Sequence, residues 1–329
     1  ELFYRFKTIM KYLITGGAGF IGIKLTEELL KYKDNKIYII DNFLKNPGNK
    51  NLLGILKNKK VKLIQKNLNN ISDYLKIYDF DYIYHFAAIL GVKKVIDNPY
   101  VTLKENISTT INLINFSKKQ KKLKKICFTS TSEVYAYSLR NKLAKYPTPE
   151  DVDFLISKDF NPRSSYLLSK IVGEYLMNYS ELNFVIFRPH NIFGPQMGFK
   201  HVIPQLTKKI IESSNNKIVI HNAKHKRTFC DINFAIELIF KISHNKNSAK
   251  KIFNIGSPDK EISIIELAQK MKKILNSKKK LLSSNVQKDN SPEKRKPDMK
   301  KSLSYTKSKH NFEKGLKETV LWYKRYHTK

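Results

Sequence analysis

The amino-acid sequence predicts an α/β protein built on a doubly wound parallel sheet, followed by a smaller carboxy-terminal domain. Three observations predict this fold class. An apolar run, a glycine-rich turn and a helical pattern follow one another directly near the start of the chain. Strand and helix patterns then alternate through the first half of the sequence. After Pro189 the alternation loosens, which predicts the second, smaller domain.

The glycine-rich turn covers residues 15–22, TGGAGFIG, directly after the apolar run Tyr12–Ile14. In turns of this kind one glycine permits the tight bend, another lets the backbone approach a phosphate, and a third lets the helix pack on the strand. A second strand at Ile37–Ile40 ends in Asp41, about 20 residues after the turn, where a carboxylate accepts hydrogen bonds from a ribose and repels a 2′-phosphate. The pattern therefore predicts a Rossmann-type domain that binds NAD rather than NADP.

Length and composition exclude several classes of protein. The 329 residues are enough for a sizeable core, and the 41% hydrophobic content is ordinary for a soluble protein. No apolar run approaches the ~18 residues that span a bilayer, so we expect no membrane association. Residues 1–9 lack the features of a signal peptide, and we expect a disordered extension there. Cys127 and Cys230 are the only cysteines, so we expect no disulfide framework and a cytoplasmic location.

The net charge of +34 raises the question of a nucleic-acid partner. The excess is almost all lysine and is spread through every segment, without an aromatic-interleaved basic stripe, so we expect a solvated lysine surface and no nucleic-acid partner. In so lysine-rich a chain, a retained arginine suggests that the planar guanidinium is needed. The arginines that fall inside motifs are Arg163, Arg188, Arg227 and Arg295.

The remaining elements complete the predicted sheet and the second domain. Further strands are predicted at Val61–Gln65, Tyr82–Ala88, Lys125–Ser130 and Phe184–Arg188, with a late strand near 251–256 that returns to the sheet. Helices are predicted at Pro99–Lys118, Ser164–Ser180, Ser263–Leu275 and Phe312–Tyr326. We expect a dinucleotide-binding domain at 10–188 and a mainly substrate-binding domain at 189–329. No metal-ligand spacing occurs, and we expect no metal.

A candidate proton-transfer group lies in the helix predicted at Ser164–Ser180. Tyr166 and Lys170 are four residues apart there, so their side chains share one face. A tyrosine beside a cation can move a proton off or onto a hydroxyl while hydride moves between carbon and cofactor. Other Tyr–Lys pairs have this spacing, but only this one lies between the fifth strand, with its Thr-Ser cluster, and the sixth.

Other stretches point to a family. They are Asp41-Asn42, HFAA (85–88), Asn106, FTSTSEVY (128–135), RPHNIFGP (188–195), KRTFCDI (226–232), FNIG (253–256) and Arg295-Lys296-Pro297. Together with the glycine-rich turn and the Tyr166/Lys170 pair, they resemble the extended short-chain dehydrogenase/reductase family. The resemblance is to its branch of nucleotide-sugar epimerases, dehydratases and decarboxylases, and it runs from Lys11 to the last helix.

The resemblance implies NAD as cofactor and a nucleotide sugar as substrate. Tyr166 would take the proton of the sugar 4-hydroxyl, Lys170 would hold the nicotinamide ribose and lower the tyrosine pKa, and Thr131 would bind the same 4-oxygen. The implied catalytic residues are Thr131, Ser132, Glu133, Tyr166 and Lys170. The implied NAD contacts are Gly16, Gly19, Phe20, Ile21, Gly22, Asp41, Asn42, Asn67, Leu68, Ala87, Ala88, Asn106, Tyr166 and Lys170. The implied substrate contacts are Asn191 and, for the diphosphate, Arg227 and Arg295.

The reaction depends on the residues after Thr131. Members of this branch first oxidise C4 of the sugar to a ketone. At the positions after the threonine, the 4,6-dehydratases have an Asp-Glu pair and the 4-epimerases usually have no acidic residue. This chain has Ser132-Glu133 there. Thr-Ser-Glu followed by Val-Tyr is similar to UDP-glucuronate decarboxylases, in which the arginine matching Arg295 interacts with the carboxylate or donates a proton. We therefore expect a UDP-hexuronate decarboxylase first and a nucleotide-sugar 4,6-dehydratase or 4-epimerase second.

Two further expectations follow. The alternative from another class of protein is a non-catalytic nucleotide-binding protein on a retained Rossmann scaffold, but the intact set of Thr131, Tyr166 and Lys170 argues against it. The resemblance also implies a homodimer, formed through the helices that follow the fourth and fifth strands.

Overall fold

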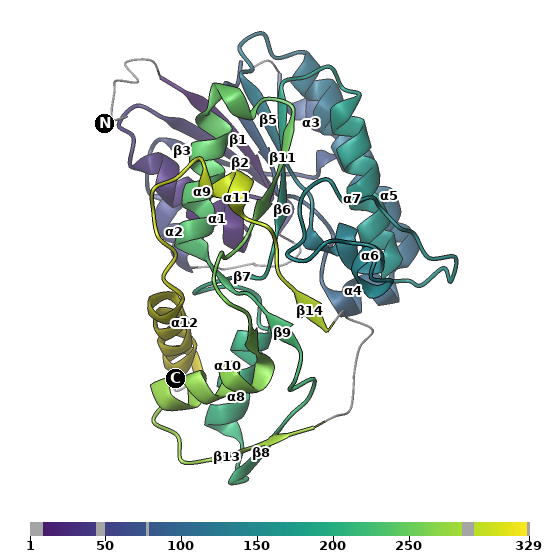
Figure 1. The fold of residues 1–329 in the computed structure, drawn as a ribbon. Helices are drawn as coiled ribbons and strands as arrows, with labels where there is room; N and C mark the ends of the chain where they lie inside the picture. Colours follow the sequence, from purple (N-terminus) through teal and green to yellow (C-terminus); the bar gives the residue numbers. More distant parts are fainter. Residues whose placement is uncertain (1–8, 44–49, 77–78, 285–292, 328–329) are drawn as a thin grey trace. The chain divides into compact units, whose positions relative to one another are not determined.

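A seven-stranded sheet is the largest sheet in the described residues (Figure 1). The structure is a computed structural model that describes residues 9–43, 50–76, 79–284 and 293–327. Its strands lie in the order β11-β6-β5-β4-β1-β2-β3. Their bounds are β1 (Lys11–Thr15), β2 (Lys36–Asp41), β3 (Val61–Gln65), β4 (Tyr82–His85), β5 (Lys125–Thr129), β6 (Phe184–Pro189) and β11 (Lys251–Ile255). The predicted Rossmann-type sheet is confirmed, and the late strand β11 joins it beside β6.

Strands β3, β2, β1, β4, β5 and β6 pair in parallel, so their carboxyl ends share one edge of the sheet. The central strands are apolar on both faces, as buried parallel strands are. Leu13 and Ile14 in β1 and Ile83 in β4 have no exposed surface. The strand order reverses between β1 and β4, and in doubly wound sheets ligands bind outside the carboxyl ends at such a switch point.

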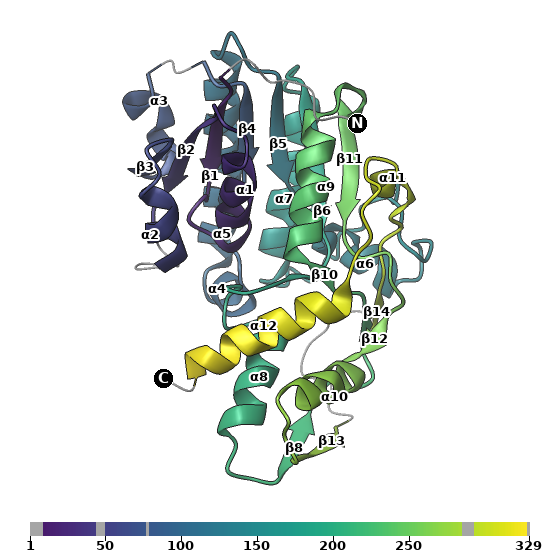
Figure 2. The same cartoon turned by 90° about the vertical axis from the view of Figure 1, so that its left-hand side faces the viewer.

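Helices cover both faces of this sheet (Figure 2). Helices α1 (Phe20–Leu30) and α9 (Ile232–His244) lie on one face, and α5 (Pro99–Lys118) and α7 (Ser164–Asn178) lie on the other. On the second face, Leu113 of α5 and Met177 of α7 join a core with Phe128 of β5. The remaining helices of this part are α2 (Lys50–Leu56), α3 (Ile71–Tyr74) and α4 (Val92–Asp97), with the short 3₁₀ helices η1 (Leu68–Asn70), η2 (Ser132–Tyr135) and η3 (Lys246–Ser248).

The described chain forms two units. Unit 1 comprises the described residues of Glu1–Val134, Ser157–Arg188 and Ile239–Phe253, and unit 2 those of Tyr135–Ile156, Pro189–Leu238 and Asn254–Lys329. The division into a dinucleotide-binding domain at 10–188 and a substrate-binding domain at 189–329 stays a prediction.

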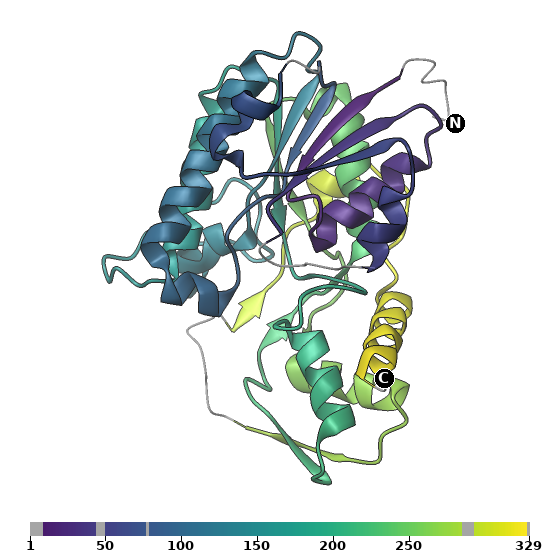
Figure 3. The same ribbon diagram turned by 180° about the vertical axis from the view of Figure 1, so that it is seen from behind.

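Unit 2 contains short strand groups and three longer helices. Helices α8 (Val202–Glu212), α10 (Ile264–Ile274) and α12 (Phe312–His327) pack on one another (Figure 3). Ser263 caps α10 in the capping box that Ser263 and Glu266 form. The shorter elements are α6 (Ala136–Arg140), β7 (Ile192–Phe193), β8 (Lys217–Ile220), β9 (Lys226–Arg227), β10 (Cys230–Asp231), β12 (Ile262–Ser263), β13 (Lys280–Ser283), β14 (Lys294–Arg295) and α11 (Lys300–Leu303).

Three elements differ from the sequence expectations. Helix α9 has no predicted counterpart, because its apolar run begins directly after strand β10 without a glycine or proline between them. Pro195 and Pro204 indicate a loop over His190–Gln205 followed by a helix, but helix α8 already begins at Val202. Pro204 lies in the first turn of α8, where an N–H is not needed. Strand β4 ends at His85 rather than Ala88.

Two expectations concern the start of the chain and membranes. Of the extension expected at 1–9, residues 1–8 lie outside the described residues. Within the described ranges, no helix is both long enough and apolar enough to cross a membrane.

Candidate functional site

The glycine-rich turn joins β1 to α1 at the switch point of the sheet. Gly16 has φ +68°, and a Cβ there would lie 2.6 Å from the backbone nitrogen of Ala87. The loops after β1 and β4 therefore touch through their backbones. A Cβ on Gly22 would lie 2.5 Å from the Cα of Gly17, so α1 also packs directly on the turn. Both positions need glycine for steric reasons, as the sequence predicts.

The amino end of α1 fits an anionic group. Its N-cap residue is Gly19, which has extended backbone angles and, as a glycine, no side chain that could cap the helix. The first turn contains no acidic residue, and it begins with Phe20 and Ile21, two of the expected NAD contacts. The first backbone N–H groups and the positive end of the helix dipole are therefore left to a ligand. This arrangement fits the pyrophosphate of a dinucleotide.

Asp41 at the end of β2 is held in a defined orientation. Its Oδ2 accepts a hydrogen bond from the Ala18 N–H at 3.1 Å, and its Oδ1 accepts one from the Phe43 N–H at 2.8 Å. Each carboxylate oxygen keeps a second lone pair. The carboxylate is thus tied to the glycine-rich turn and can still accept hydrogen bonds from the hydroxyls of a ribose.

The outer expected NAD contacts follow the carboxyl ends of β2, β3 and β4. Asn42 is exposed, Leu68 is buried, and Ala87 and Ala88 are partly exposed. The exposed Asn67 caps η1, with its Oδ1 accepting from the Asn69 N–H at 3.2 Å. The structure therefore places all of them at the edge of the sheet that carries the glycine-rich turn.

Asn106 on α5 is engaged within the protein. Its Oδ1 accepts from the Ile89 N–H at 2.7 Å, and its Nδ2 donates to the Ile89 carbonyl at 3.1 Å and to Ser169 Oγ at 3.1 Å. Ser169 lies between Tyr166 and Lys170 in the sequence. The amide of Asn106 therefore ties the loop after β4 to helix α7, and its expected contact with the cofactor stays a prediction.

Tyr166 and Lys170 lie on α7 beside the end of β5. The Lys170 ammonium is buried, donates to the carbonyl of Thr129 at 2.8 Å and lies 6.0 Å from the Tyr166 ring centroid. Burial raises the pKa of Tyr166 to about 12, opposed by a hydrogen bond with Thr131 that lowers it. The charge of Glu133 raises the same pKa. The lowering expected from Lys170 stays a prediction.

The Thr-Ser-Glu run follows β5 directly. Thr131 Oγ1 accepts from the Glu133 N–H at 3.2 Å, and Ser132 is buried. The Glu133 carboxylate lies 3.3 Å and 3.4 Å from Nη2 of Arg163, the residue before α7. Both side chains are partly exposed. The structure therefore brings together Thr131, Glu133, Tyr166 and Lys170, which come from two elements.

Two hydroxyls at this place were not among the expected site residues. Thr129 Oγ1 and Ser130 Oγ are buried and form no hydrogen bond with the described residues. A buried hydroxyl without a partner is costly, so these groups fit a site that a polar ligand completes. The signal was present in the sequence, because both residues belong to the run that contains Thr131.

His85, at the end of β4, is buried between the hydroxyl groups of Thr15 and Thr110. Its Nδ1 is 2.7 Å from Thr15 Oγ1, and its Nε2 is 3.3 Å from Thr110 Oγ1. Burial, and then the charge of Lys170, lowers the pKa of His85 to about 3. The imidazole is therefore uncharged at neutral pH and adds no second cation beside Lys170.

In unit 2, the two arginines expected to bind a diphosphate are neighbours. Strands β9 and β14 pair in parallel with Arg227 opposite Arg295, although the residues are far apart in the sequence. Both side chains are more than nine-tenths buried. Nη1 of Arg227 donates to the carbonyls of Lys226 and Glu293 at 2.7 Å and 2.8 Å. Paired guanidinium groups form a strongly cationic position that suits phosphate groups.

Asn191, the third expected substrate contact, also lies in unit 2. It has φ +42°, a left-handed conformation that asparagine tolerates better than most residues. Its Nδ2 donates to the carbonyl of Thr228 at 3.0 Å. Because Thr228 follows Arg227, the amide supports the segment that carries one of the two arginines.

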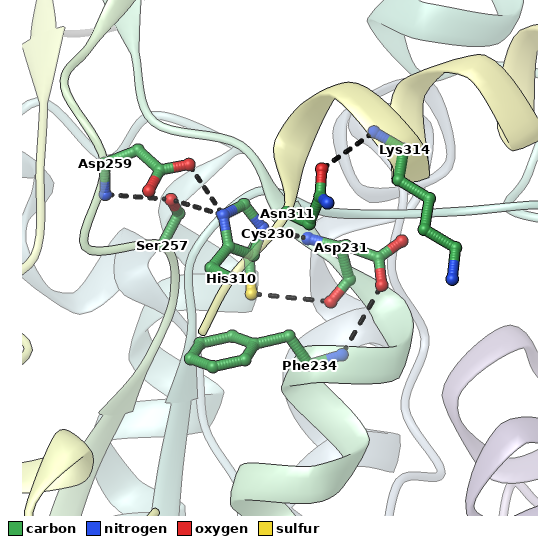
Figure 4. Close-up of polar contacts among 8 residues, drawn as sticks. All are labelled: Cys230, Asp231, Phe234, Ser257, Asp259, His310, Asn311 and Lys314. Atoms are coloured by element: carbon green, nitrogen blue, oxygen red, sulfur yellow. Dashed lines mark hydrogen bonds and ion pairs between the residues drawn. The ribbon is translucent and has the colours of Figure 1, made fainter. Parts of the chain in front are cut away.

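Unit 2 also contains a Ser-His-Asp group that is not a catalytic triad (Figure 4). The Asp231 N–H donates to Nε2 of His310 at 2.9 Å, so the proton of the neutral ring is on Nδ1. Nδ1 lies 2.6 Å from Oδ2 of Asp259 and 3.2 Å from Oγ of Ser257. No ring nitrogen is left to accept a proton from the serine, so the group joins the starts of α9 and α12 rather than activating a nucleophile.

No group of three or more His, Cys, Asp or Glu side chains in the described ranges is placed to hold a metal ion.

A protein-family model fits residues 12–256, and its description is NAD dependent epimerase/dehydratase family. The chain belongs to this family. The match covers the glycine-rich turn, the Thr-Ser-Glu run, the Tyr166/Lys170 pair and Arg227. The predicted resemblance is confirmed.

Individual proteins agree with this membership. The chain is 32% identical to the UDP-N-acetyl-alpha-D-glucosaminuronate decarboxylase of Bacillus cytotoxicus, over 95% of this chain and 97% of that protein. It is 35% identical to the bifunctional polymyxin resistance protein ArnA of Wigglesworthia glossinidia brevipalpis, over 80% of this chain and 41% of that longer protein.

Solved structures give the same fold. The crystal structure of the UDP-glucuronic acid 4-epimerase of Bacillus cereus, in complex with UDP-glucuronic acid and NAD, has a TM-score of 0.83 and 25% identity. The match covers 96% of this chain and 100% of that one. The PbgP3 protein of Burkholderia pseudomallei has a TM-score of 0.80 at 21% identity, over 98% of both chains, which supports the fold alone.

Proposed function

We propose that the protein binds NAD and a nucleotide-activated sugar, and that it decarboxylates a UDP-hexuronate through a 4-keto intermediate. One observation carries the proposal. Tyr166 has a hydrogen bond with Thr131, and Lys170 and Glu133 lie beside this pair at the end of β5 in unit 1. The full-length similarity to a UDP-hexuronate decarboxylase supports the choice of reaction.

The proposed cofactor site uses the groups around the switch point. The backbone N–H groups at the start of α1 bind the pyrophosphate, and the oriented carboxylate of Asp41 binds the adenosine ribose. Lys170 binds the nicotinamide ribose. When bound, NAD would supply the acceptor, and on return the donor, of the hydride at C4 of the sugar. Asp41 would repel a 2′-phosphate, which favours NAD over NADP.

In the proposed oxidation, Tyr166 accepts the proton of the sugar 4-hydroxyl while Thr131 holds the same oxygen. Burial raises the pKa of Tyr166 to about 12, so little phenolate exists at neutral pH without further positive charge. Lys170 is the cation of the protein that would supply this charge, and a bound oxidised nicotinamide would add to it. We therefore expect Tyr166 to become an effective base only when the cofactor is bound.

In the proposed second step, the bond between C5 and the carboxylate carbon breaks and carbon dioxide leaves. The electron pair is delocalised onto the 4-oxygen, to which Tyr166 and Thr131 donate hydrogen bonds. The Glu133 carboxyl group, which takes up a proton from solvent, would then donate that proton to C5. We assign this acid–base chemistry to Glu133, with the hydroxyl of Ser132 as a polar contact. We assign the binding of the diphosphate to Arg227 and Arg295, and the binding of the carboxylate to Arg295. Asn191 binds the sugar nucleotide.

The second candidate reaction is 4-epimerisation of a UDP-hexuronate, which the similarity to the Bacillus cereus enzyme favours. Epimerisation needs the same oxidation at C4 but leaves the carboxylate in place. A 4,6-dehydratase ranks third, because Ser132-Glu133 replaces the Asp-Glu pair of such enzymes. A non-catalytic nucleotide-binding protein is the alternative outside enzymes.

The Tyr166→Phe variant separates an enzyme from a binding protein. Loss of a positioned base lowers turnover by about 10²- to 10⁴-fold. We expect that loss with UDP-glucuronate as substrate, together with NAD affinity close to that of the wild type by titration calorimetry. Wild-type turnover in the variant would contradict the catalytic assignment.

The proposal includes a homodimer. Helices α4, α5 and α7 carry exposed apolar side chains, and such surfaces often mark protein contacts. These side chains are Val92, Ile96, Tyr100, Val101, Ile111 and Tyr175. Size-exclusion chromatography with light scattering tests this, since a monomer at micromolar concentration would contradict it.

We propose a cytoplasmic location and no nucleic-acid partner. Cys127 and Cys230 are both free and buried, which suits reducing conditions. A nucleic-acid binder would show a steep salt dependence of its affinity for DNA, so a DNA titration at two salt concentrations tests the second point.

A further inference from the structure

A buried ion pair holds the helix that carries Tyr166 and Lys170. Arg188 at the end of β6 is the largest fully buried side chain in the described ranges, and Glu174 on α7 is 4% exposed. Nε of Arg188 donates to Oε1 of Glu174 at 2.9 Å, and Nη2 donates to Oε2 at 2.6 Å. A fork of two parallel hydrogen bonds defines both a distance and a direction between two elements.

Glu174 continues the face of α7 that carries the proposed catalytic pair. Tyr166, Lys170 and Glu174 follow one another at intervals of four residues, so their side chains lie along one side of the helix. Lys170 donates to the carbonyl of Thr129 at the end of β5. Strands β5 and β6 are adjacent, with Thr129 opposite Phe187. Helix α7 is therefore tied to the carboxyl ends of two neighbouring strands.

The packing of α7 sets its height above the sheet but not its position along its own axis. A Cβ on Gly173 would lie 2.3 Å from Cζ of Phe128, so this glycine lets the helix rest directly on the ring. The same ring lies 4.9 Å from the Lys170 ammonium. An apolar contact of this kind is not directional and resists sliding only weakly. The fork between Glu174 and Arg188 is directional.

We propose that Glu174 and Arg188 are positioning residues, which fix the register of α7 against β6 and so place Tyr166 and Lys170. The inference rests on the proposed function, because that function makes Tyr166 the base. Stability alone does not require this pair, since apolar side chains of similar volume often replace a buried ion pair without loss. A two-point contact does require a guanidinium and a carboxylate.

The double variant Glu174→Leu with Arg188→Met separates positioning from stability. It fills the same space without charge, so we expect a melting temperature close to that of the wild type. Misplacement of the pair by about 1 Å lowers turnover by up to about 10²-fold, so we expect kcat to fall at least tenfold with little change in KM. We also expect the pH profile of kcat to shift to higher pH, because a poorer contact between Tyr166 and Lys170 raises the pKa of the tyrosine. Wild-type kcat with an unchanged pH profile would overturn the proposal.

The Asp81→Asn variant is the matched control. Asp81 is also buried and accepts from the Lys124 ammonium at 3.1 Å and from the Lys11 N–H at 2.9 Å. It precedes β4, at the opposite edge of the sheet from the glycine-rich turn. We expect this variant to lose stability and to keep the wild-type pH profile. If it changes kcat and the profile as the double variant does, both effects are general and the positioning role is wrong.

Two further measurements keep the test decisive. Arg188→Lys keeps the charge but not the fork, and it replaces the double variant if that variant does not fold. It should reproduce the fall in kcat. The ¹³Cζ signal of Tyr166, assigned with Tyr166→Phe, needs no turnover. It should move in the double variant and stay unchanged in Asp81→Asn. If no nucleotide sugar is converted, the proposed function fails, while an unmoved Tyr166 signal would by itself overturn the positioning role.

Discussion

Replacing Gly16 with alanine tests the geometry of the switch point most severely. Gly16 has φ +68°, where an L-residue is strained. A Cβ there would lie 2.6 Å from N and 2.8 Å from Cα of Ala87, and 2.8 Å from the carbonyl carbon of Phe86. All three atoms are backbone at the end of a central strand, so no side chain can move aside to make room.

The size of the effect follows from two contributions. The left-handed conformation costs about 1–2 kcal/mol for a residue with a Cβ. Overpacking in a well-packed place costs about 1–3 kcal/mol more. If the turn shifts to relieve the contact, the N–H groups at the start of α1 leave the pyrophosphate. A loss of about 2–5 kcal/mol in binding corresponds to an NAD affinity lower by about 30-fold to a few thousand-fold.

The assay is titration calorimetry with NAD, together with urea unfolding of the same samples. Gly54→Ala is the matched control, because among the described residues, apart from the backbone of its own helix, no atom lies within 4 Å of the Cβ position of Gly54. In the helix α2 this control should be neutral or stabilising by about 1 kcal/mol or less. Wild-type NAD affinity and unfolding in Gly16→Ala would refute the steric account of the turn.

Three further predictions follow. Burial lowers the pKa of His85 to about 3, whereas the usual value of ~6.5 applies to the unfolded chain. Between these two values the unfolded chain binds more protons than the folded protein, so the free energy of unfolding decreases as the pH falls. The His85→Gln variant should lack about 2 kcal/mol of this decrease between pH 6.5 and 5. Urea unfolding at the two pH values checks it, and an identical pH dependence in the variant would be contrary to it. Arg227→Lys keeps the positive charge but loses the planar guanidinium that can bind a phosphate through two hydrogen bonds, so UDP should bind about tenfold more weakly by calorimetry. Replacement of the neighbouring, exposed Lys226 in Lys226→Met should change the UDP affinity little. Equal losses of affinity in both variants would indicate a general effect of charge. His310→Ala removes the hydrogen-bond partner of the Asp231 N–H and of the Asp259 carboxylate. It should lower the free energy of unfolding by about 2–3 kcal/mol and leave kcat unchanged. A lower kcat with wild-type stability would instead indicate a role of His310 in the reaction.

Much of unit 1 could be predicted because its signals are local in the sequence. The order strand, glycine turn, helix and Asp41 lies within residues 11–41 and has few structural solutions. The Tyr166/Lys170 spacing has a direct helical meaning, and the structure places both residues beside Thr131. Alternating patterns also predicted the strands of the sheet closely, since buried parallel strands are nearly continuous apolar runs.

What could not be predicted depends on pairings between distant segments. The sequence contains Arg227 and Arg295 in separate motifs, and only the pairing of β9 with β14 makes them neighbours. The full engagement of Asn106 with Ile89 and Ser169 is likewise a contact between three segments. The sequence marks Arg188 as a retained arginine inside a motif, but nothing local marks Glu174 as its partner, because the two residues lie on different elements.

The most direct test of the central claim is mass spectrometry of the purified protein with NAD and UDP-glucuronate, with UDP-N-acetylglucosaminuronate as a second substrate. The account predicts a product that has lost carbon dioxide, and Tyr166→Phe should not form it. An unchanged mass with an altered sugar NMR spectrum would mean a 4-epimerase, and loss of water from a neutral nucleotide hexose would mean a dehydratase. Bound NAD with no change in any nucleotide sugar would contradict the proposed reaction.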